Sequence, residues 1–216
     1  MEHAEFDRAL IAAAFAEIAA VGWSRFSVAG AARSAGLDMA LARTRFPCRA
    51  TLLLRFGRLA DTGALTGALT DGSVRDRLFD RLMRRIDTLQ DHRAGMLALL
   101  RALPADPATA LLLAVASRSS MGWILETAGV SASGPRGELR RKGLLAVWLW
   151  TLRAWQRDDS ADLSATMAAL DQALVRADQA AAWLRGGQGD SEQGSDGKPT
   201  TGTRFRAESD WEPGAL

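Results

Sequence analysis

The amino-acid sequence predicts an all-α protein of about nine helices, and three observations lead to this fold class. Apolar residues recur at the three-to-four-residue spacing of one helix face along most of the chain. The alternating pattern of a half-buried strand is almost absent, and tyrosine does not occur. Glycine, proline and capping residues divide the periodic stretches into segments of helical length.

The first four helices are expected to be three short ones and a longer one. Gly22 follows an apolar stripe at the usual position of a left-handed cap, and Pro47 ends the third helix. Ser27 and Asp38 are residues that cap the second and third helices well. The expected spans are about 10–21, 27–34, 38–46 and 49–69.

Five further helices are expected before the chain becomes polar. Ser73 and Ser160 are capping residues, whereas Pro107 and Pro135 suit the first helical position. The expected spans are about 73–89, 93–102, 107–127, 135–157 and 160–184. Residues 186–216 are polar and glycine-rich, so we expect a disordered tail there.

The composition predicts a soluble cytoplasmic protein with no stable membrane insertion. The formal net charge is only +2, and Cys48 is the single cysteine, which excludes an internal disulfide. The uncharged apolar runs are about half the length that a membrane-spanning helix needs. Residues 24–58 nevertheless hold seven arginines and only one acidic residue, and this local excess of positive charge suits phosphate binding. The alternative interpretation is that these arginines only form a solvent-exposed basic surface that binds nothing.

The last predicted helix carries an apolar seam with alternating spacings of four and three residues, which favours a partner helix. The helix before it is apolar nearly all round. We therefore expect a homodimer, with intrachain core packing as the alternative. The predicted interface residues are Leu163, Met167, Leu170, Leu174, Ala177 and Ala181.

Residues 13–54 resemble the TetR family of bacterial regulators. The likeness rests on Gly22-Trp23 after the first helix, Ser27-Val28 at the start of the second, Ala35-Gly36-Leu37 at the turn, and Phe46-Pro47 after the third. The resemblance implies a helix-turn-helix head over 1–47, a ligand-binding and dimerisation domain over 48–185, and double-stranded operator DNA as partner. It also implies regulation by a hydrophobic small molecule or lipid.

The resemblance places the DNA contacts on the third helix and on the starts of neighbouring helices. Arg43 and Arg45 would reach phosphates and a guanine edge, and Ser27 and Arg49 would reach phosphates. Asp38-Met39 stands where the family usually has a Ser/Thr-Lys pair, so a negative charge would face the DNA. The predicted DNA-binding residues are Ser27, Asp38, Met39, Ala40, Arg43, Thr44, Arg45 and Arg49.

The C-terminal half also resembles the lipid-binding accessory proteins of ubiquinone biosynthesis, which share the TetR-like fold without reading DNA. The matching stretches are 121–129 and 153–174, with Asp158-Asp159-Ser160, Asp162, Thr166 and Leu170-Asp171 as the matching elements. This likeness implies a lipid or isoprenoid ligand and is the alternative to gene regulation.

Aromatic and methionine residues on neighbouring helices suit a hydrophobic ligand, although plain core packing is an equal alternative. The predicted ligand-binding residues are Met96, Leu100, Met121, Trp123, Ile124, Trp148 and Trp155. With His3 and His92 as the only histidines, we expect no enzyme activity, no metal and no cofactor. Cys48 is expected to cap a helix.

Overall fold

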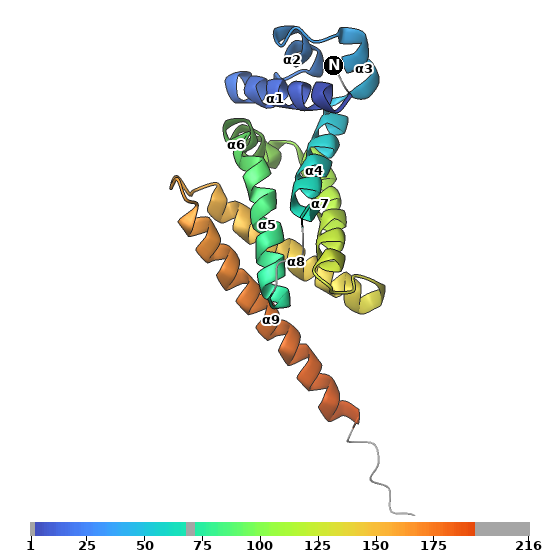
Figure 1. Cartoon of the computed structure of the whole chain (residues 1–216), viewed down its shortest axis with the longest axis vertical. Coiled ribbons are helices and arrows are strands. Elements are labelled where there is room, and N and C mark those ends of the chain that lie inside the picture. Colours follow the sequence, from blue (N-terminus) through green and yellow to red (C-terminus); the bar gives the residue numbers. More distant parts are fainter. Residues whose placement is uncertain (1–2, 68–71, 193–216) are drawn as a thin grey trace, which may run out of the picture. The chain divides into compact units, whose positions relative to one another are not determined.

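The computed structural model describes residues 3–67 and 72–192, with side chains up to residue 182 (Figure 1). This described part contains nine α-helices, one 3₁₀ turn and no strand, which confirms the predicted fold class. The helices are α1 (His3–Val21), α2 (Val28–Ser34), α3 (Met39–Arg45), α4 (Arg49–Leu65), α5 (Val74–Gln90), α6 (Arg93–Ala102), α7 (Pro107–Thr127), α8 (Gly134–Trp155) and α9 (Ser164–Glu192), and the 3₁₀ turn is Leu103–Ala105.

Most helices begin where a capping residue predicted a start. The Ser27 Oγ accepts a hydrogen bond from the Gly30 amide at 2.9 Å, and the Asp106 carboxylate accepts one from the Thr109 amide at 3.0 Å. Ser73 and Asp76 cap each other's backbone amides at the start of α5. These bonds satisfy amides that have no partner inside their own helix, so the caps fix the boundaries.

The last helix differs from its prediction at both ends. It begins at Ser164 instead of Ser160, because Leu163 has a positive φ of 54° that interrupts the helix. It continues to Glu192, so residues 186–192 are helical and the predicted boundary of the tail is wrong there. Residues 193–216 of the predicted tail lie outside the described part of the chain.

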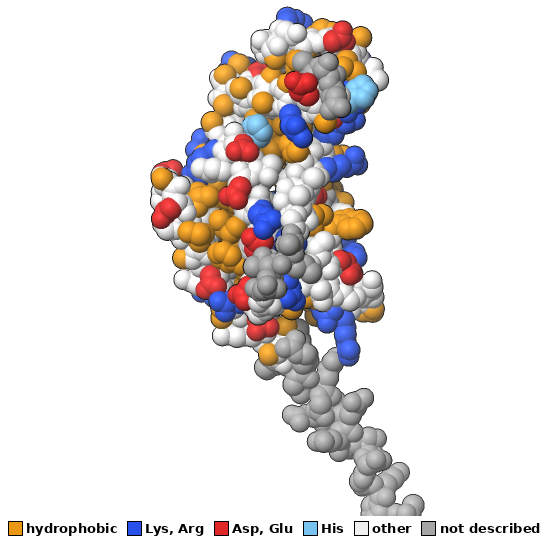
Figure 2. Space-filling model, in the orientation of Figure 1, with side chains coloured by type: hydrophobic (Ala, Val, Ile, Leu, Met, Phe, Trp, Pro, Cys, Tyr) orange, Lys and Arg blue, Asp and Glu red, His pale blue; other side chains and the backbone are white. Residues whose placement is uncertain are grey.

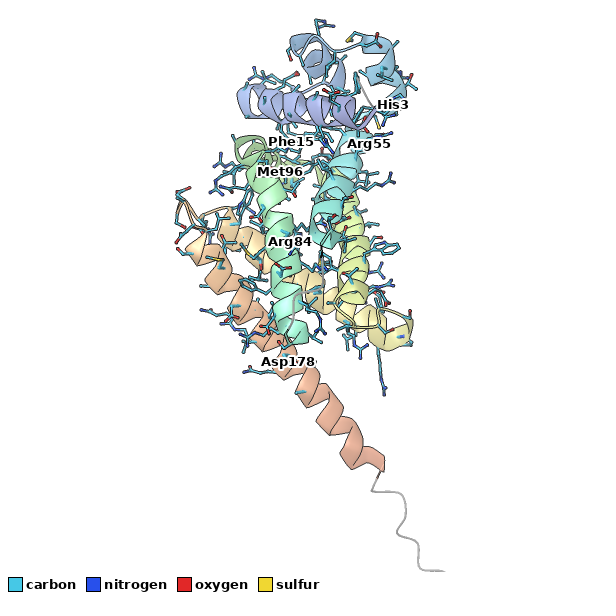
Figure 3. The ribbon with its side chains drawn as sticks, in the orientation of Figure 1. His3, Phe15, Arg55, Arg84, Met96 and Asp178 are labelled. Atoms are coloured by element: carbon cyan, nitrogen blue, oxygen red, sulfur yellow. The ribbon has the colours of Figure 1, made fainter. Side chains whose placement is uncertain are left out.

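Among the described residues, those up to Asp178 form one compact unit and those from Gln179 onward form a second. In the first unit, α1–α3 lie together at one end and α1 packs across α6, where Phe15 and Met96 are labelled in Figure 3. α4 packs against α5 and α7, and α7 packs against α8. The hydrophobic core is continuous from α1 into α9, so the packing shows no boundary between two domains at residue 47. The division into a head over 1–47 and a second domain over 48–185 therefore remains a prediction.

Three of the six residues of the predicted dimer seam are buried inside the chain. Leu163, Leu170 and Leu174 are all less than 8% exposed and belong to the hydrophobic core. Arg75 of α5 also pairs with Asp171 of α9 at 2.8 Å. The assignment of these three leucines to a dimer interface is therefore corrected, because the chain's own packing covers them. Met167 and Ala177 are half-buried, and Ala181 belongs to the second unit.

One helix in the described part of the chain, α7, is long and apolar enough to cross a membrane by length and composition. Core helices of globular proteins meet the same criterion. In the first unit α7 packs against both α4 and α8, and it also carries the exposed apolar side chains Leu111, Val115 and Trp123.

Candidate nucleic-acid interface

Two short helices joined by a tight turn form the candidate interface. Gly36 has a φ of 64°, which glycine adopts without strain, and the Leu37 amide donates to the Ala32 carbonyl at 2.9 Å. Ala31, Ala32 and Ala42 are buried between the helices, where small side chains allow close packing. The turn and these alanines therefore fix the direction of α3.

The outward edge of α3 carries four exposed side chains: Met39, Ala40, Arg43 and Thr44. Arg43 donates from Nη1 to the Pro47 carbonyl at 2.8 Å, which uses one of the five guanidinium N–H groups. The Thr44 hydroxyl donates to the Ala40 carbonyl at 2.9 Å and can still accept a bond. The Asp38 carboxylate, at the start of the helix, accepts from the Leu41 amide at 2.6 Å. Arg43 is thus the cation that α3 presents to solvent.

Arg45 is bound inside the head instead. Its Nε and Nη2 atoms donate to the two carboxylate oxygens of Asp7 on α1, at 2.5 and 2.6 Å. Arg55 of α4 donates to the same carboxylate at 2.8 Å. The hydrogen bonds from Arg45 hold the pKa of Asp7 below its usual value. The predicted contact of Arg45 with DNA is therefore corrected to a structural role.

Arg49 also has a structural role that the sequence did not reveal. Its guanidinium donates to the carbonyls of Trp23 and Ser24, at 3.2 and 3.3 Å, and lies 5.4 Å from the Trp23 ring centroid. These contacts tie the start of α4 to the loop after α1. Ser27, in contrast, is exposed, and its hydroxyl accepts from Gly30 while its own hydrogen remains available.

A cleft of about 440 Å³ runs between the starts of α2 and α4 and the side of α3. It brings together four of the predicted DNA-binding residues, namely Ser27, Met39, Arg43 and Arg49. Cys48 also lines this cleft as the N-cap of α4, and the hydroxyl of Thr51 holds the pKa of its thiol below the ordinary value.

Three further exposed arginines were missing from the predicted set. Arg25 before α2, Arg33 on α2 and Arg58 on α4 form no ion pair with a described residue, although Arg25 donates from Nε to the Val21 carbonyl at 2.9 Å. The cluster of seven arginines in the sequence contained them, but only the fold shows which members Asp7 neutralises. On the face shown in Figure 2, Lys and Arg side chains lie in separate places instead of in one continuous stripe.

The predicted ligand-binding residues divide into three groups. Met96, Leu100 and Trp148 line a cavity of about 700 Å³ between α4, α5, α6, α7 and α8. Met121, Ile124 and Trp155 are fully buried core residues outside the cavity lining, and Trp123 is 64% exposed on α7. The assignment of these four to a ligand site is therefore corrected.

The cavity wall includes Arg85, a buried cation that the sequence did not suggest, and its carboxylate partner Asp61 lies outside the lining. Arg85 of α5 is 5% exposed, lies 5.0 Å from the Trp148 ring centroid and pairs with Asp61 of α4. The Asp61 carboxylate also accepts from the Ser120 hydroxyl at 2.6 Å. Burial lowers the pKa of Arg85 to about 10, so the guanidinium keeps its charge at neutral pH.

Solved structures with the same arrangement of helices decide the fold. A TetR transcriptional regulator from Nitrosomonas europaea matches with a TM-score of 0.63 and 18% identity, covering 80% of this chain and 98% of the other. A TetR-family transcriptional regulator from Streptomyces coelicolor matches with a TM-score of 0.55 and 21% identity, covering 81% and 82%. This chain has the TetR fold. Comparisons with protein-family models and with curated proteins gave no match.

Within the TetR fold, the aspartates that carry the likeness to the quinone accessory proteins have a structural role. Asp158 is 4% exposed, and its carboxylate accepts bonds from the amide and the hydroxyl of Thr166, both at 2.7 Å. It also accepts from the amide and hydroxyl of Ser160. These bonds, led by that of the Ser160 hydroxyl, lower the pKa of Asp158 to about 2. The cluster connects α8 to α9.

Proposed function

We propose that this chain is a TetR-like transcriptional regulator that binds operator DNA as a cytoplasmic homodimer and responds to a hydrophobic small molecule. The observation that carries the proposal is the outward edge of α3, where Arg43 and Thr44 are exposed on a helix fixed by its turn. The fold, which this chain shares with the solved regulators, supports it.

In this proposal α3 enters the major groove, where a guanidinium can donate to two acceptors of a guanine. Arg43 has unused N–H groups for such a contact. Ser27, the N-cap of α2, lines the same cleft as Arg43 and would contact a phosphate, which positions the helix without specifying sequence. Arg45 and Arg49 would act indirectly, because their bonds hold α3 and α4 in place.

A homodimer would supply the second half-site contact that such a short recognition helix needs. Exposed apolar side chains on α7 and α8 support an interface there, since a monomer rarely leaves such groups in solvent together. They are Leu111, Val115 and Trp123 on α7, and Leu139, Leu149 and Trp150 on α8. The proposed interface therefore involves helix faces different from the buried seam of α9.

A ligand in the 700 Å³ cavity would act on the head through α4. The cavity is lined by Leu53 and Phe56 of α4, and Arg55 of the same helix holds Asp7 beneath α3. A ligand that favours one position of α4 would change the spacing of the two heads, which couples ligand affinity to operator affinity.

The test is the replacement of the exposed arginine of α3. We expect Arg43→Gln to weaken binding to duplex DNA from upstream of the gene by about tenfold or more, because one bidentate base contact contributes ~1–3 kcal/mol. Lys142→Gln on α8 removes the same charge from an exposed residue outside the head and should have no effect. Equal affinities of Arg43→Gln and the wild type, measured by fluorescence anisotropy, would contradict the proposal.

The alternative is a lipid or isoprenoid carrier with the same fold. It is favoured by the apolar cavity and by the engagement of Arg45, Arg49 and Arg55 in internal contacts, which reduces the charge available to DNA. Mass spectrometry of the organic extract of the purified protein tests it directly. A stoichiometric isoprenoid in a protein that ignores DNA would establish the carrier, whereas an empty protein that binds its upstream DNA would exclude it.

A further inference from the structure

The cavity between α4 and α8 has a lining that is apolar apart from a few cationic and neutral polar side chains. Its polar members are Arg85, Ser117, Arg153, Gln156 and Arg157, and no carboxylate lines it. Its volume of about 700 Å³ falls in the range of small-molecule sites in proteins, roughly 300–1,000 Å³. A neutral apolar ligand would provide no negative charge to balance these guanidinium groups.

The three guanidinium groups differ in their partners. Arg85 is buried, and the carboxylate of Asp61 already balances its charge. A ligand carboxylate beside Arg85 would be a second buried anion on one cation. The single positive charge of Arg85 could not compensate for the desolvation of both carboxylates. The interior end of the cavity is therefore suited to the apolar part of a ligand.

Arg153 and Arg157 carry the charge that nothing in the described part of the chain balances. Both are exposed, neither forms an ion pair with a described residue, and they lie four residues apart in and just after the last turn of α8. Both side chains line the same cavity, so both guanidinium groups can approach one anion there. Because they are exposed, an anion between them keeps part of its hydration and avoids the cost of burial.

We propose that the cavity binds an amphipathic monocarboxylate, such as a medium-chain fatty acid, with its carboxylate on Arg153 and Arg157 and its chain along the apolar wall. The wall for the chain includes Leu53, Phe56, Leu99 and Leu113. Burial of the chain supplies most of the affinity, and the guanidinium pair selects for the acid. This inference rests on the effector site of the proposed function and names the class of molecule that occupies it.

The experiment compares two probes of the same chain length, sodium dodecanoate and 1-dodecanol, titrated into the full-length protein without DNA. Quenching of tryptophan fluorescence gives the two dissociation constants, since Trp148 lies in the cavity wall. We expect the acid to bind about tenfold more tightly than the alcohol, because charge-assisted hydrogen bonds are stronger than neutral ones. Equal affinities, or no binding of dodecanoate, would overturn the proposal.

Variants then locate the carboxylate. We expect the double variant Arg153→Gln/Arg157→Gln to lose the preference for dodecanoate and to keep its affinity for dodecanol. The control Arg140→Gln/Lys142→Gln removes two positive charges from the same helix outside the cavity lining and should keep the preference. A preference that survives in the first variant, or disappears equally in the control, would contradict the assignment. Because no DNA is present, failure of operator binding and failure of this assignment give separate results.

Discussion

At the scale of single residues, Asp7 determines which arginines of the head face solvent. It binds Arg45 and Arg55 together, so one carboxylate holds two of the seven arginines between residues 24 and 58 in internal ion pairs. The number and spacing of the arginines could be read from the sequence alone. It could not reveal their pairing, because Asp7 lies 38 and 48 residues away from its two partners.

The Asp7 cluster predicts a pH-dependent contribution to stability. Asp7→Asn removes the charge that Arg45 and Arg55 share, and we expect the free energy of unfolding at pH 7 to fall by about 1–3 kcal/mol. The pKa of Asp7 is lowered by folding, so this contribution is present above the unfolded value of 3.8 and is lost as the pH falls below it.

Urea denaturation at pH 7 and at successively lower pH measures this difference. Glu5→Gln, an exposed carboxylate on the same helix, serves as the control and should change stability little at either pH. A loss of stability in Asp7→Asn that stays constant down to pH 3 would show that the charge of Asp7 is not responsible.

Asp158 gives a second residue-scale prediction. Asp158→Asn leaves the Thr166 amide and hydroxyl with weakened acceptors, so we expect the free energy of unfolding at pH 7 to fall by about 1–3 kcal/mol. Because folding lowers its pKa from 3.8 to about 2, the contribution is lost between those values as pH decreases. Asp159→Asn, at a side chain that is 95% exposed, is the matched control. Equal effects of the two variants in urea titrations would contradict the role of Asp158.

At the scale of secondary-structure elements, helix starts were predictable because their signals are local. Ser27, Asp38 and Ser73 each cap the helix that the sequence assigned to them. The end of α9 and the burial of its leucines were not predictable, because a heptad-like seam fits an intrachain neighbour as well as a second copy. The packing of α1 on α6 likewise had no local signal.

The contact between α1 and α6 depends on a glycine. A Cβ atom at Gly95 would lie 2.2 Å from the Phe15 carbonyl oxygen, too close for any real contact. We expect Gly95→Ala to lower the free energy of unfolding by about 2–3 kcal/mol, since the backbone of α1 must move.

Gly143 in α8 is the matched control for this substitution, because a Cβ there meets nothing within 4 Å. Gly143→Ala should raise the free energy of unfolding by up to about 1 kcal/mol through helix propensity. Thermal unfolding of both variants measures the difference, and equal stabilities would show that α1 and α6 are not closely packed.

At the scale of the whole molecule, the fold was largely predictable and the sites only in part. Periodicity and caps predicted about nine helices, and the described part of the chain contains nine. Met96, Leu100 and Trp148 line a cavity, and their role in ligand binding remains a prediction. Trp123 was misassigned because α7 is apolar on its exposed face as well as on its buried face, and spacing alone does not distinguish them.

The exposed apolar faces of α7 and α8 predict the oligomeric state. We expect the wild type to have twice the mass of one chain by light scattering, and Trp123→Glu/Leu139→Glu to have the mass of a single chain. Both side chains are more than half exposed in one chain, so the change should leave the circular dichroism of the fold intact. The matched control, Glu126→Gln, alters an exposed residue of α7 without adding a charge to the apolar face and should remain dimeric. A double variant that stays dimeric would place the interface elsewhere.

The most direct test of the central claim is a titration of the wild-type chain with two duplexes of equal length, one from upstream of its gene and one with that sequence scrambled. The outward edge of α3 predicts that the upstream duplex binds about 10³-fold or more tightly, with an affinity that falls steeply as salt rises. Equal affinity for both duplexes at every salt concentration would contradict the account.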